Sequence, residues 1–234
     1  MKTNHLLVPV LAALGLAALP ASATIYSDPT GDVFTGAGGG ILDITSVEVT
    51  SGATDLNFKI NLAGDPVATD WGKYMIGLDT APGGDTAGNG WARPIGLSSG
   101  MDYWVGSWAD SGNGAEIWKY TGSWGLQSAT YGANPDLVNI SKTTSSVTLN
   151  FQFAGLGLAP GSTILFDVYT SGGGATDGAV DSLANPTPTI SDWGNYYSGP
   201  GVSYTIPVVP EPATCVLLGL GSLVLVRRVL RRNA

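Results

Sequence analysis

The chain has 234 residues, of which 34 are glycine, 44% are hydrophobic and only 12% are charged. This composition excludes a collagen, a coiled coil and a multi-pass membrane protein, and it predicts a turn-rich globular protein with a buried core. Residues 24–209 carry five basic and seventeen acidic side chains, a net charge of −12 that argues against nucleic acid as a partner.

Residues 1–23 have the three parts of a secretory signal peptide. Lys2 provides the positive charge, an apolar run extends from Leu6 to Leu19, and small residues lead up to Ala23. The run is shorter than the ~20 residues that a membrane-spanning helix needs, which favours cleavage over retention as an anchor. We expect a signal peptidase to cut after Ala23, so that the exported protein begins at Thr24.

Acidic residues are prominent at the start of the exported chain. Asp28, Asp32 and Asp43 could converge on Ca²⁺, which prefers several oxygen ligands including loop carbonyls. The alternative is that Asp28 and Asp32 are turn residues whose carboxylates accept hydrogen bonds from nearby backbone amides. Two acids of a later loop, Asp177 and Asp181, are further candidates for metal binding.

Apolar and polar residues alternate with period two along much of the chain, as expected of strands with one buried face. We expect strands at 41–49, 56–62, 74–78, 101–109, 115–120, 147–153, 164–168 and 202–206. Turn sequences rich in Gly, Pro, Asn and Asp separate them, and no stretch has a convincing helical period. The pattern predicts an all-β fold, an antiparallel β-sandwich of jelly-roll or immunoglobulin-like type.

Two segments are expected to be loops, residues 35–40 and residues 170–201. The second exceeds thirty residues, a length that indicates either a functional segment or a poorly ordered one. It contains the sequence DWGNY at 192–196, which is similar to DWGKY at 70–74.

The aromatic residues suggest a binding platform. Trp104 and Trp108 would share one face of a strand, about 13 Å apart, with Gly106 between them leaving a flat slot. Trp118 and Tyr120 on the next strand would extend this surface, on which the CH-rich face of a pyranose could stack. The alternative, and the commoner use of large aromatics, is that they fill one side of the core. Solvent exposure separates the two interpretations.

The reactive side chains exclude several classes of enzyme. The only histidine, His5, and the only cysteine, Cys215, both lie outside residues 24–209. This excludes Ser-His-Asp and Cys-His catalysis, zinc sites built on His or Cys, and disulfides in that region. Glu48 and Glu116 are its only glutamates and give no specific signal for a glycosidase. We therefore expect no enzymatic activity.

The C-terminal segment, residues 210–234, has three parts in a fixed order. Pro210, Glu211 and Pro212 are followed by an apolar run at 213–226, which we expect to be a transmembrane helix. An arginine-rich tail that begins with Arg227 and Arg228 would remain on the cytoplasmic side of the inner membrane.

These three parts together resemble the PEP-CTERM sorting signal of exported proteins in Gram-negative bacteria. The resemblance implies that an exosortase-type enzyme cuts the precursor near Pro210-Glu211-Pro212 and passes it to the cell surface or its polysaccharide matrix. An ordinary C-terminal membrane anchor is the alternative.

A second resemblance lies in the first 60 residues after the signal peptide. The acidic turn 28–32, the strand 42–47, the strand 56–60 and the sequence Leu-Asp-Thr at 78–80 resemble the opening of DOMON-like and family 9 carbohydrate-binding β-sandwiches. The resemblance implies a sandwich that binds a sugar or a metal ion.

Two functions are therefore expected of residues 24–209. The first is a non-enzymatic protein of the cell surface or the exopolysaccharide matrix, sorted by an exosortase-type system. The alternative is a carbohydrate-binding module displayed at the surface, which could depend on calcium and would take polysaccharide as its partner.

Overall fold

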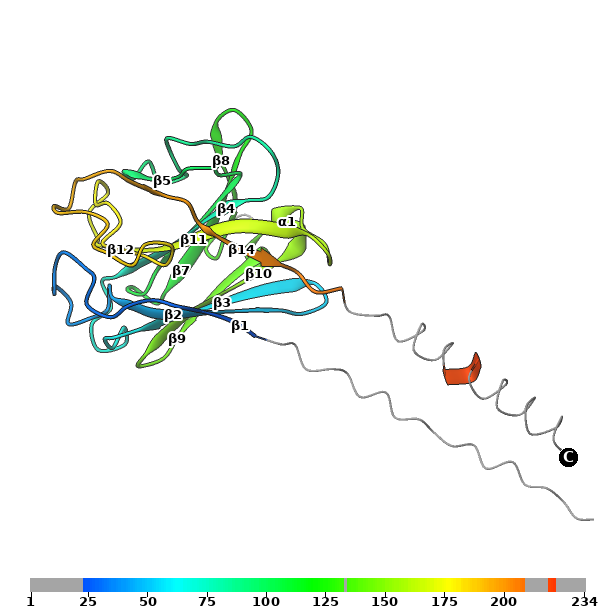
Figure 1. Ribbon diagram of the computed structural model, residues 1–234, viewed down its shortest axis with the longest axis horizontal. Helices are drawn as coiled ribbons and strands as arrows, with labels where there is room; N and C mark the ends of the chain where they lie inside the picture. The colour runs from blue at the N-terminus through cyan, green and yellow to red at the C-terminus, as the bar shows by residue number, and fades with distance from the viewer. Residues whose placement is uncertain (1–22, 133, 209–218, 222–234) are drawn as a thin grey trace, which may run out of the picture. The chain divides into compact units, whose positions relative to one another are not determined.

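The computed structural model describes residues 23–132, 134–208 and 219–221 (Figure 1). Apart from Ala23, the residues on which signal-peptide cleavage and C-terminal sorting are predicted lie outside these ranges: 1–22, Pro210, Glu211, Pro212, Arg227 and Arg228. None of the helices in the described part of the chain has both the length and the apolar character needed to cross a membrane. All the strands belong to one compact unit that ends at Val208.

The first of two large sheets has five antiparallel strands in the order β1-β2-β3-β10-β9 (Figure 1). Their bounds are β1 Thr24–Ser27, β2 Ile44–Ser51, β3 Asp55–Leu62, β9 Val138–Lys142 and β10 Ser146–Gln152. β1 begins directly after Ala23 and pairs along its whole length with β2. It leads into Asp28 at the start of the acidic turn.

The second large sheet has seven antiparallel strands in the order β12-β11-β4-β6-β7-β8, with β14 also paired to β11. Their bounds are β4 Lys73–Asp79, β6 Tyr103–Trp108, β7 Gly114–Tyr120, β8 Trp124–Ala129, β11 Thr163–Ser171, β12 Asp181–Ser182 and β14 Val202–Thr205. The described residues also form one short parallel pair, β5 Ile95–Leu97 with β13 Tyr197–Gly199. The helical elements described with these strands are the 3-10 turn η1 Pro135–Leu137 and the single turn α1 Phe153–Leu156.

The main core lies between the inner faces of these two sheets. In β3 every second side chain is buried, which is the alternation that the sequence predicts. Phe58 of β3 stacks on Phe151 of β10 at 5.3 Å and meets Phe166 of β11 edge-on at 4.9 Å. Because side chains of both sheets share one buried cluster, the predicted all-β, antiparallel architecture is confirmed.

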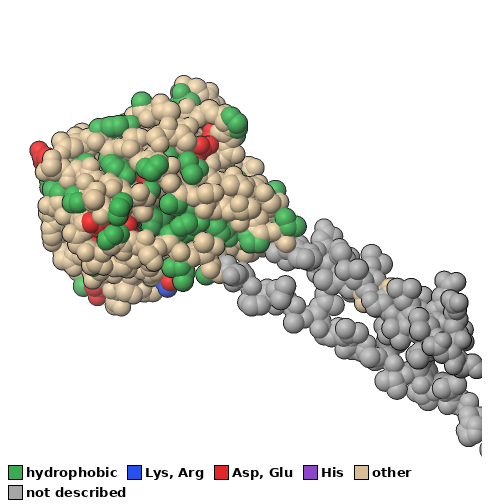
Figure 2. Space-filling model, viewed as in Figure 1, with side chains coloured by type: hydrophobic (Ala, Val, Ile, Leu, Met, Phe, Trp, Pro, Cys, Tyr) green, Lys and Arg blue, Asp and Glu red, His purple; other side chains and the backbone are tan. Residues whose placement is uncertain are grey.

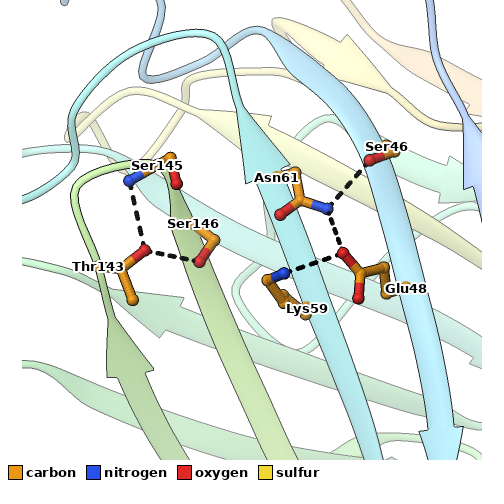
Figure 3. Close-up of polar contacts among 7 residues, drawn as sticks. All are labelled: Ser46, Glu48, Lys59, Asn61, Thr143, Ser145 and Ser146. Atoms are coloured by element: carbon orange, nitrogen blue, oxygen red, sulfur yellow. Dashed lines mark hydrogen bonds and ion pairs between the residues drawn. The ribbon is translucent and has the colours of Figure 1, made fainter. Parts of the chain in front are cut away.

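The outer face of the first sheet carries polar, partly exposed side chains that bond to one another (Figure 3). Glu48 of β2 accepts hydrogen bonds from Lys59 at 2.9 Å and Asn61 at 3.0 Å, and Asn61 also donates to Ser46 at 3.0 Å. Between the neighbouring strands β9 and β10, the hydroxyl groups of Thr143 in the turn and of Ser146 at the start of β10 are 2.8 Å apart and form a hydrogen bond. This face follows the simple pattern of a strand with one wet side.

The outer face of the second sheet is covered instead. Long connections, residues 80–102 and 172–196, fold over it and build a second apolar cluster. Buried side chains from β4, β6 and β11 meet side chains of these connections and of β13 there: Met75, Trp104, Tyr169, Ile95, Leu97, Met101, Ala179, Ile190 and Tyr197. The segment expected as a loop at 170–201 is thus well packed, and it contains β12 and β13.

Candidate metal centre

The acidic turn after β1 is held in place by its own backbone contacts. The Asp28 amide donates to Thr45 O of β2 at 3.1 Å, and Gly31 adopts a left-handed φ of 89°. Both carboxylate oxygens of Asp43 accept from the Gly31 amide, at 3.1 and 3.0 Å. Asp43 therefore stabilises the turn by accepting a hydrogen bond from a backbone amide. This is the role that was expected as the alternative for Asp28 and Asp32.

Asp28 and Asp32 converge with a residue from the other end of the chain. One carboxylate oxygen each from Asp28, Asp32 and Asp181 lies within 4.8 Å of the other two. Asp181 belongs to β12 and is fully buried. Its Oδ2 accepts from the Ile44 amide of β2 at 2.7 Å, and its Oδ1 accepts from the Ser182 amide at 2.8 Å. The cluster thus joins the two large sheets at one place.

Three oxygens of Asp28 and Asp32 in this cluster lack donors. Asp28 and Asp32 are each 9% exposed, yet Asp28 Oδ2 and both carboxylate oxygens of Asp32 have no hydrogen-bond partner. A buried polar group without a partner costs about 1–3 kcal/mol, and more when it is charged. Two carboxylates with such oxygens, lying close to the buried carboxylate of Asp181, are an arrangement that a bound cation would stabilise.

The electrostatics of the cluster point the same way. Burial, followed by repulsion from Asp181, Asp32, Asp167 and Asp43, raises the pKa of Asp28 to about 9. Burial is also the main cause that raises the pKa of Asp181 to about 7 and raises the pKa of Asp32. The charges that act on Asp28 are all negative. A divalent cation would reverse this balance and hold the carboxylates ionised.

The donor set is made of hard oxygens only. Three carboxylates match the oxygen coordination of Ca²⁺ better than they match the nitrogen and sulfur ligands of zinc. Asp177 takes no part: its carboxylate accepts from the Gly174 amide at 2.8 Å, and its carbonyl accepts from Arg93 at 3.0 Å. The fitted set is Asp28, Asp32 and Asp181, with Asp43 behind the turn.

The predicted aromatic platform has a different structure from the one expected. Trp104 is fully buried, 6.3 Å from Trp91 and 6.1 Å from Tyr169, so it has no face on which a sugar could stack. The slot over Gly106 is closed, because a Cβ there would clash with the ring of Trp91. The predicted slot is absent because Trp91, from the connection 80–102, occupies the space above Gly106 that the strand pattern leaves open.

The other platform residues keep part of their surface exposed. Trp108 is partly buried and lies over Gly114, its cross-strand partner. Trp118 and Tyr120 are also partly buried, and Tyr120 contacts Trp124 at 5.4 Å. Trp118, like Trp91, donates its indole N–H to a glutamate rather than facing solvent with it.

That glutamate, Glu116, is a second buried acid. It is 8% exposed and receives hydrogen bonds from Trp91 Nε1 at 2.6 Å, from Trp118 Nε1 at 2.8 Å and from the Tyr131 hydroxyl. Glu48, the other glutamate of residues 24–209, lies on the outer face of the other sheet. The two glutamates therefore lie on different sheets and have different hydrogen-bond partners.

A scan of the chain against protein-family models found no match, and a search of curated proteins found none that is significantly similar.

Proposed function

We propose that this chain is a non-enzymatic protein displayed outside the cytoplasm, at the cell surface or in the polysaccharide matrix, whose sandwich is completed by bound Ca²⁺. The observation that supports the calcium site is the group of orphaned oxygens on Asp28 and Asp32 beside Asp181. Calcium sites of extracellular modules work at about 10⁻⁴–10⁻³ M, a concentration range suited to an exported protein.

Sorting is the second part of the proposal. It rests on the sequence at the two ends: cleavage by a signal peptidase after Ala23, retention in the inner membrane by residues 213–226, and cutting by an exosortase-type enzyme near Pro210-Glu211-Pro212. Mass spectrometry of surface material should find an N-terminus at Thr24 and no peptide beyond Pro212. Recovery of the intact arginine tail from mature surface protein would overturn this part alone.

The calcium site is tested by titrating the metal-stripped protein with Ca²⁺ in a calorimeter, and by melting it with Ca²⁺ or with a chelator. At 100 times Kd the ion stabilises the folded state by about 2.7 kcal/mol, which raises the melting temperature of a domain of this size by roughly 5–10 °C. Asp32→Ala should abolish both the heat and the shift. Asp136→Ala, at an exposed acid of η1, is the matched control and should change neither.

A surface-displayed carbohydrate-binding module is the second candidate. It is favoured by the partly exposed rings of Trp108, Trp118 and Tyr120 on the second sheet. A glycan should then bind with the protein fold unchanged. The candidate fails if no polysaccharide of a broad panel binds the protein.

A further inference from the structure

We propose that a hollow at the edge of the sandwich, lined by Trp108, Asn113, Tyr131 and Asn139, binds one unit of a neutral polysaccharide. The hollow has a volume of about 500 Å³, within the range of ordinary ligand sites. It is built from the β6–β7 turn, the segment after β8 and the edge strand β9, and none of its residues belongs to the metal centre. This inference rests on the second candidate function and assigns it a site.

The aromatic part of the hollow is held rigidly. The ring of Trp108 lies over Gly114, where a Cβ would collide with it. Tyr131 is 66% exposed, and its ring centre lies 6.0 Å from that of Trp108 at 45°. Because the Tyr131 hydroxyl donates to buried Glu116, the exposed ring is fixed before any ligand arrives. A fixed, exposed ring offers stacking area to a sugar at a low cost in conformational entropy.

The polar part is supplied by a turn of unusual geometry. Ser111, Gly112 and Asn113 have consecutive positive φ angles of 50°, 89° and 66°. This conformation places Asn113 in the wall of the hollow, where its side-chain Oδ1 is buried without a hydrogen-bond partner. The side-chain Nδ2 of the same residue is not buried in this way, and it can donate a hydrogen bond to a sugar hydroxyl. Across the hollow Asn139 is exposed on β9 and offers a second amide.

The charge of the surroundings selects the class of sugar. The eight residues that line the hollow include no Asp, Glu, Lys or Arg. The nearby Asp110 is paired with Lys73 at 3.1 Å, so that lysine is not free to bind an anion. Acidic side chains also appear at several separate places on the face drawn in Figure 2, with little basic surface. Uronic acids and sulfated sugars would be repelled, which leaves a neutral hexose or pentose unit.

The location at a rim also indicates how a polymer would bind. β8 and β9 are edge strands of the two sheets, and β9 contacts β7 across the rim. Because no strand of its sheet lies beyond β9, a polymer can continue past the unit bound there, and the hollow can accept a unit from the interior of a chain. We therefore expect binding to strengthen from a monosaccharide to a hexasaccharide.

The test uses calorimetry of the full-length protein with cello-, laminari-, manno- and xylo-hexaose, and with hexamers of galacturonate and mannuronate as anionic probes. We expect at least one neutral hexamer to bind and the anionic ones not to. Tyr131→Ala should weaken that binding at least tenfold. Asn113→Gly, which tolerates the φ of 66° and removes only the amide, should weaken it several-fold. Tyr196→Ala, at an exposed tyrosine outside the hollow, should leave it unchanged.

The outcomes separate the site from the function. Neutral binding that both Tyr131→Ala and Asn113→Gly leave intact overturns the hollow as the site while the carbohydrate-binding function stands. Tighter binding of an anionic hexamer overturns the neutral class. No binding of any hexamer overturns both the site and the second candidate function. Melting curves of each variant show whether a loss of affinity reflects unfolding. The chelator experiment tests the metal centre, and its result does not depend on whether the hollow binds a sugar.

Discussion

Glu116 and Asp32 are both acidic side chains removed from water, and they have opposite environments. Glu116, 8% exposed, is the common acceptor of two indole N–H groups and a tyrosine hydroxyl. Asp32, 9% exposed, has no donor on either oxygen and other carboxylates as its neighbours. The protein supplies hydrogen-bond donors to both oxygens of Glu116 and none to those of Asp32, and this contrast is the basis for proposing that an ion binds at Asp32.

This difference teaches how to distinguish a structural acid from a binding acid. Burial is the same for both residues, so burial alone is uninformative. The distribution of donors separates them, because a satisfied carboxylate stabilises its surroundings and an unsatisfied one destabilises them until a ligand arrives. Substitutions at the two places should therefore have effects of opposite sign under metal-free conditions.

The largest expected effect is that of Glu116→Ala. It leaves the indole N–H groups of Trp91 and Trp118 without an acceptor, at a cost of about 1–3 kcal/mol each, and opens a cavity. We expect a loss of about 3 kcal/mol or more, which lowers the melting temperature by roughly 6–12 °C with or without calcium. A change below 2 °C, measured by calorimetry, would contradict the role assigned to this glutamate.

Asp32→Asn should change the melting temperature in opposite directions with and without Ca²⁺. In chelator the substitution removes one negative charge from a crowded site, so we expect the melting temperature to rise by a few degrees. In saturating Ca²⁺ it removes a ligand and forfeits up to about 2.7 kcal/mol of stabilisation. A shift of the melting temperature in the same direction under both conditions would contradict the proposed metal centre. Asp136→Asn serves as the control for a change of net charge.

A third expectation concerns pH and Asp167, a fully buried acid outside the cluster. Burial raises its pKa to about 7 in the folded protein, above the ordinary value of 3.8. Between these values the folded state holds a proton that the unfolded state has released, so the free energy of unfolding falls as pH rises, by at most about 1.4 kcal/mol per pH unit. The contribution is fully present below about pH 4 and is lost above about pH 7.

Asp167→Asn isolates this contribution. An amide can accept from the Val168 and Ala184 amides as the acid does, and it can donate to Ser182 Oγ, which now lies 2.6 Å from Asp167 Oδ2. Denaturant unfolding in chelator at pH 5, 6, 7 and 8 should give a shallower decline for the variant than for the wild type. Parallel curves would show that Asp167 does not titrate in this range.

The smallest effect is expected on the open face of the first sheet. Lys59 and Glu48 form an ion pair of 2.9 Å in which both side chains are exposed to solvent. Such pairs contribute about 0.2–1 kcal/mol, so Lys59→Met should shift the melting temperature by no more than about 2 °C, and by less in high salt. A larger loss would mean that this face carries a contact beyond those in Figure 3.

The sequence predicts the strand faces well because alternation is a local property. β3 and β10 show it clearly, with apolar side chains paired across the sheet at Phe58–Leu149 and Leu56–Phe151. β1, β8 and β9 are harder to find. β1 has mainly exposed residues, and β8 and β9 are edge strands with little of the regular pattern. At position 153 the expected strand gives way to α1.

The candidate sites depend on contacts that no local pattern contains. Asp28 and Asp32 lie four residues apart and could be grouped. Asp181 is a further candidate by its acidity alone, but its place beside them depends on β12 and on the Ile44 amide. Trp91 closes the slot over Gly106 from a separate connection. The two DWG sequences do not by themselves predict a shared contact. In the structure Trp71 and Trp193 both pack on the small cluster of Ile41, Leu42 and Val180.

The joining of Asp32 to Asp181 has a consequence for the order in which the protein matures. The two residues are separated by about 150 positions, so an ion bound between them closes one of the longest loops that the chain can form. Asp28 and Asp32 precede most of the strands in the sequence, whereas Asp181 follows most of them. The three carboxylates come together only after β11 and β12 have joined the second sheet. A Ca²⁺ ion bound as proposed would therefore stabilise sheets that have already paired and would not start their formation.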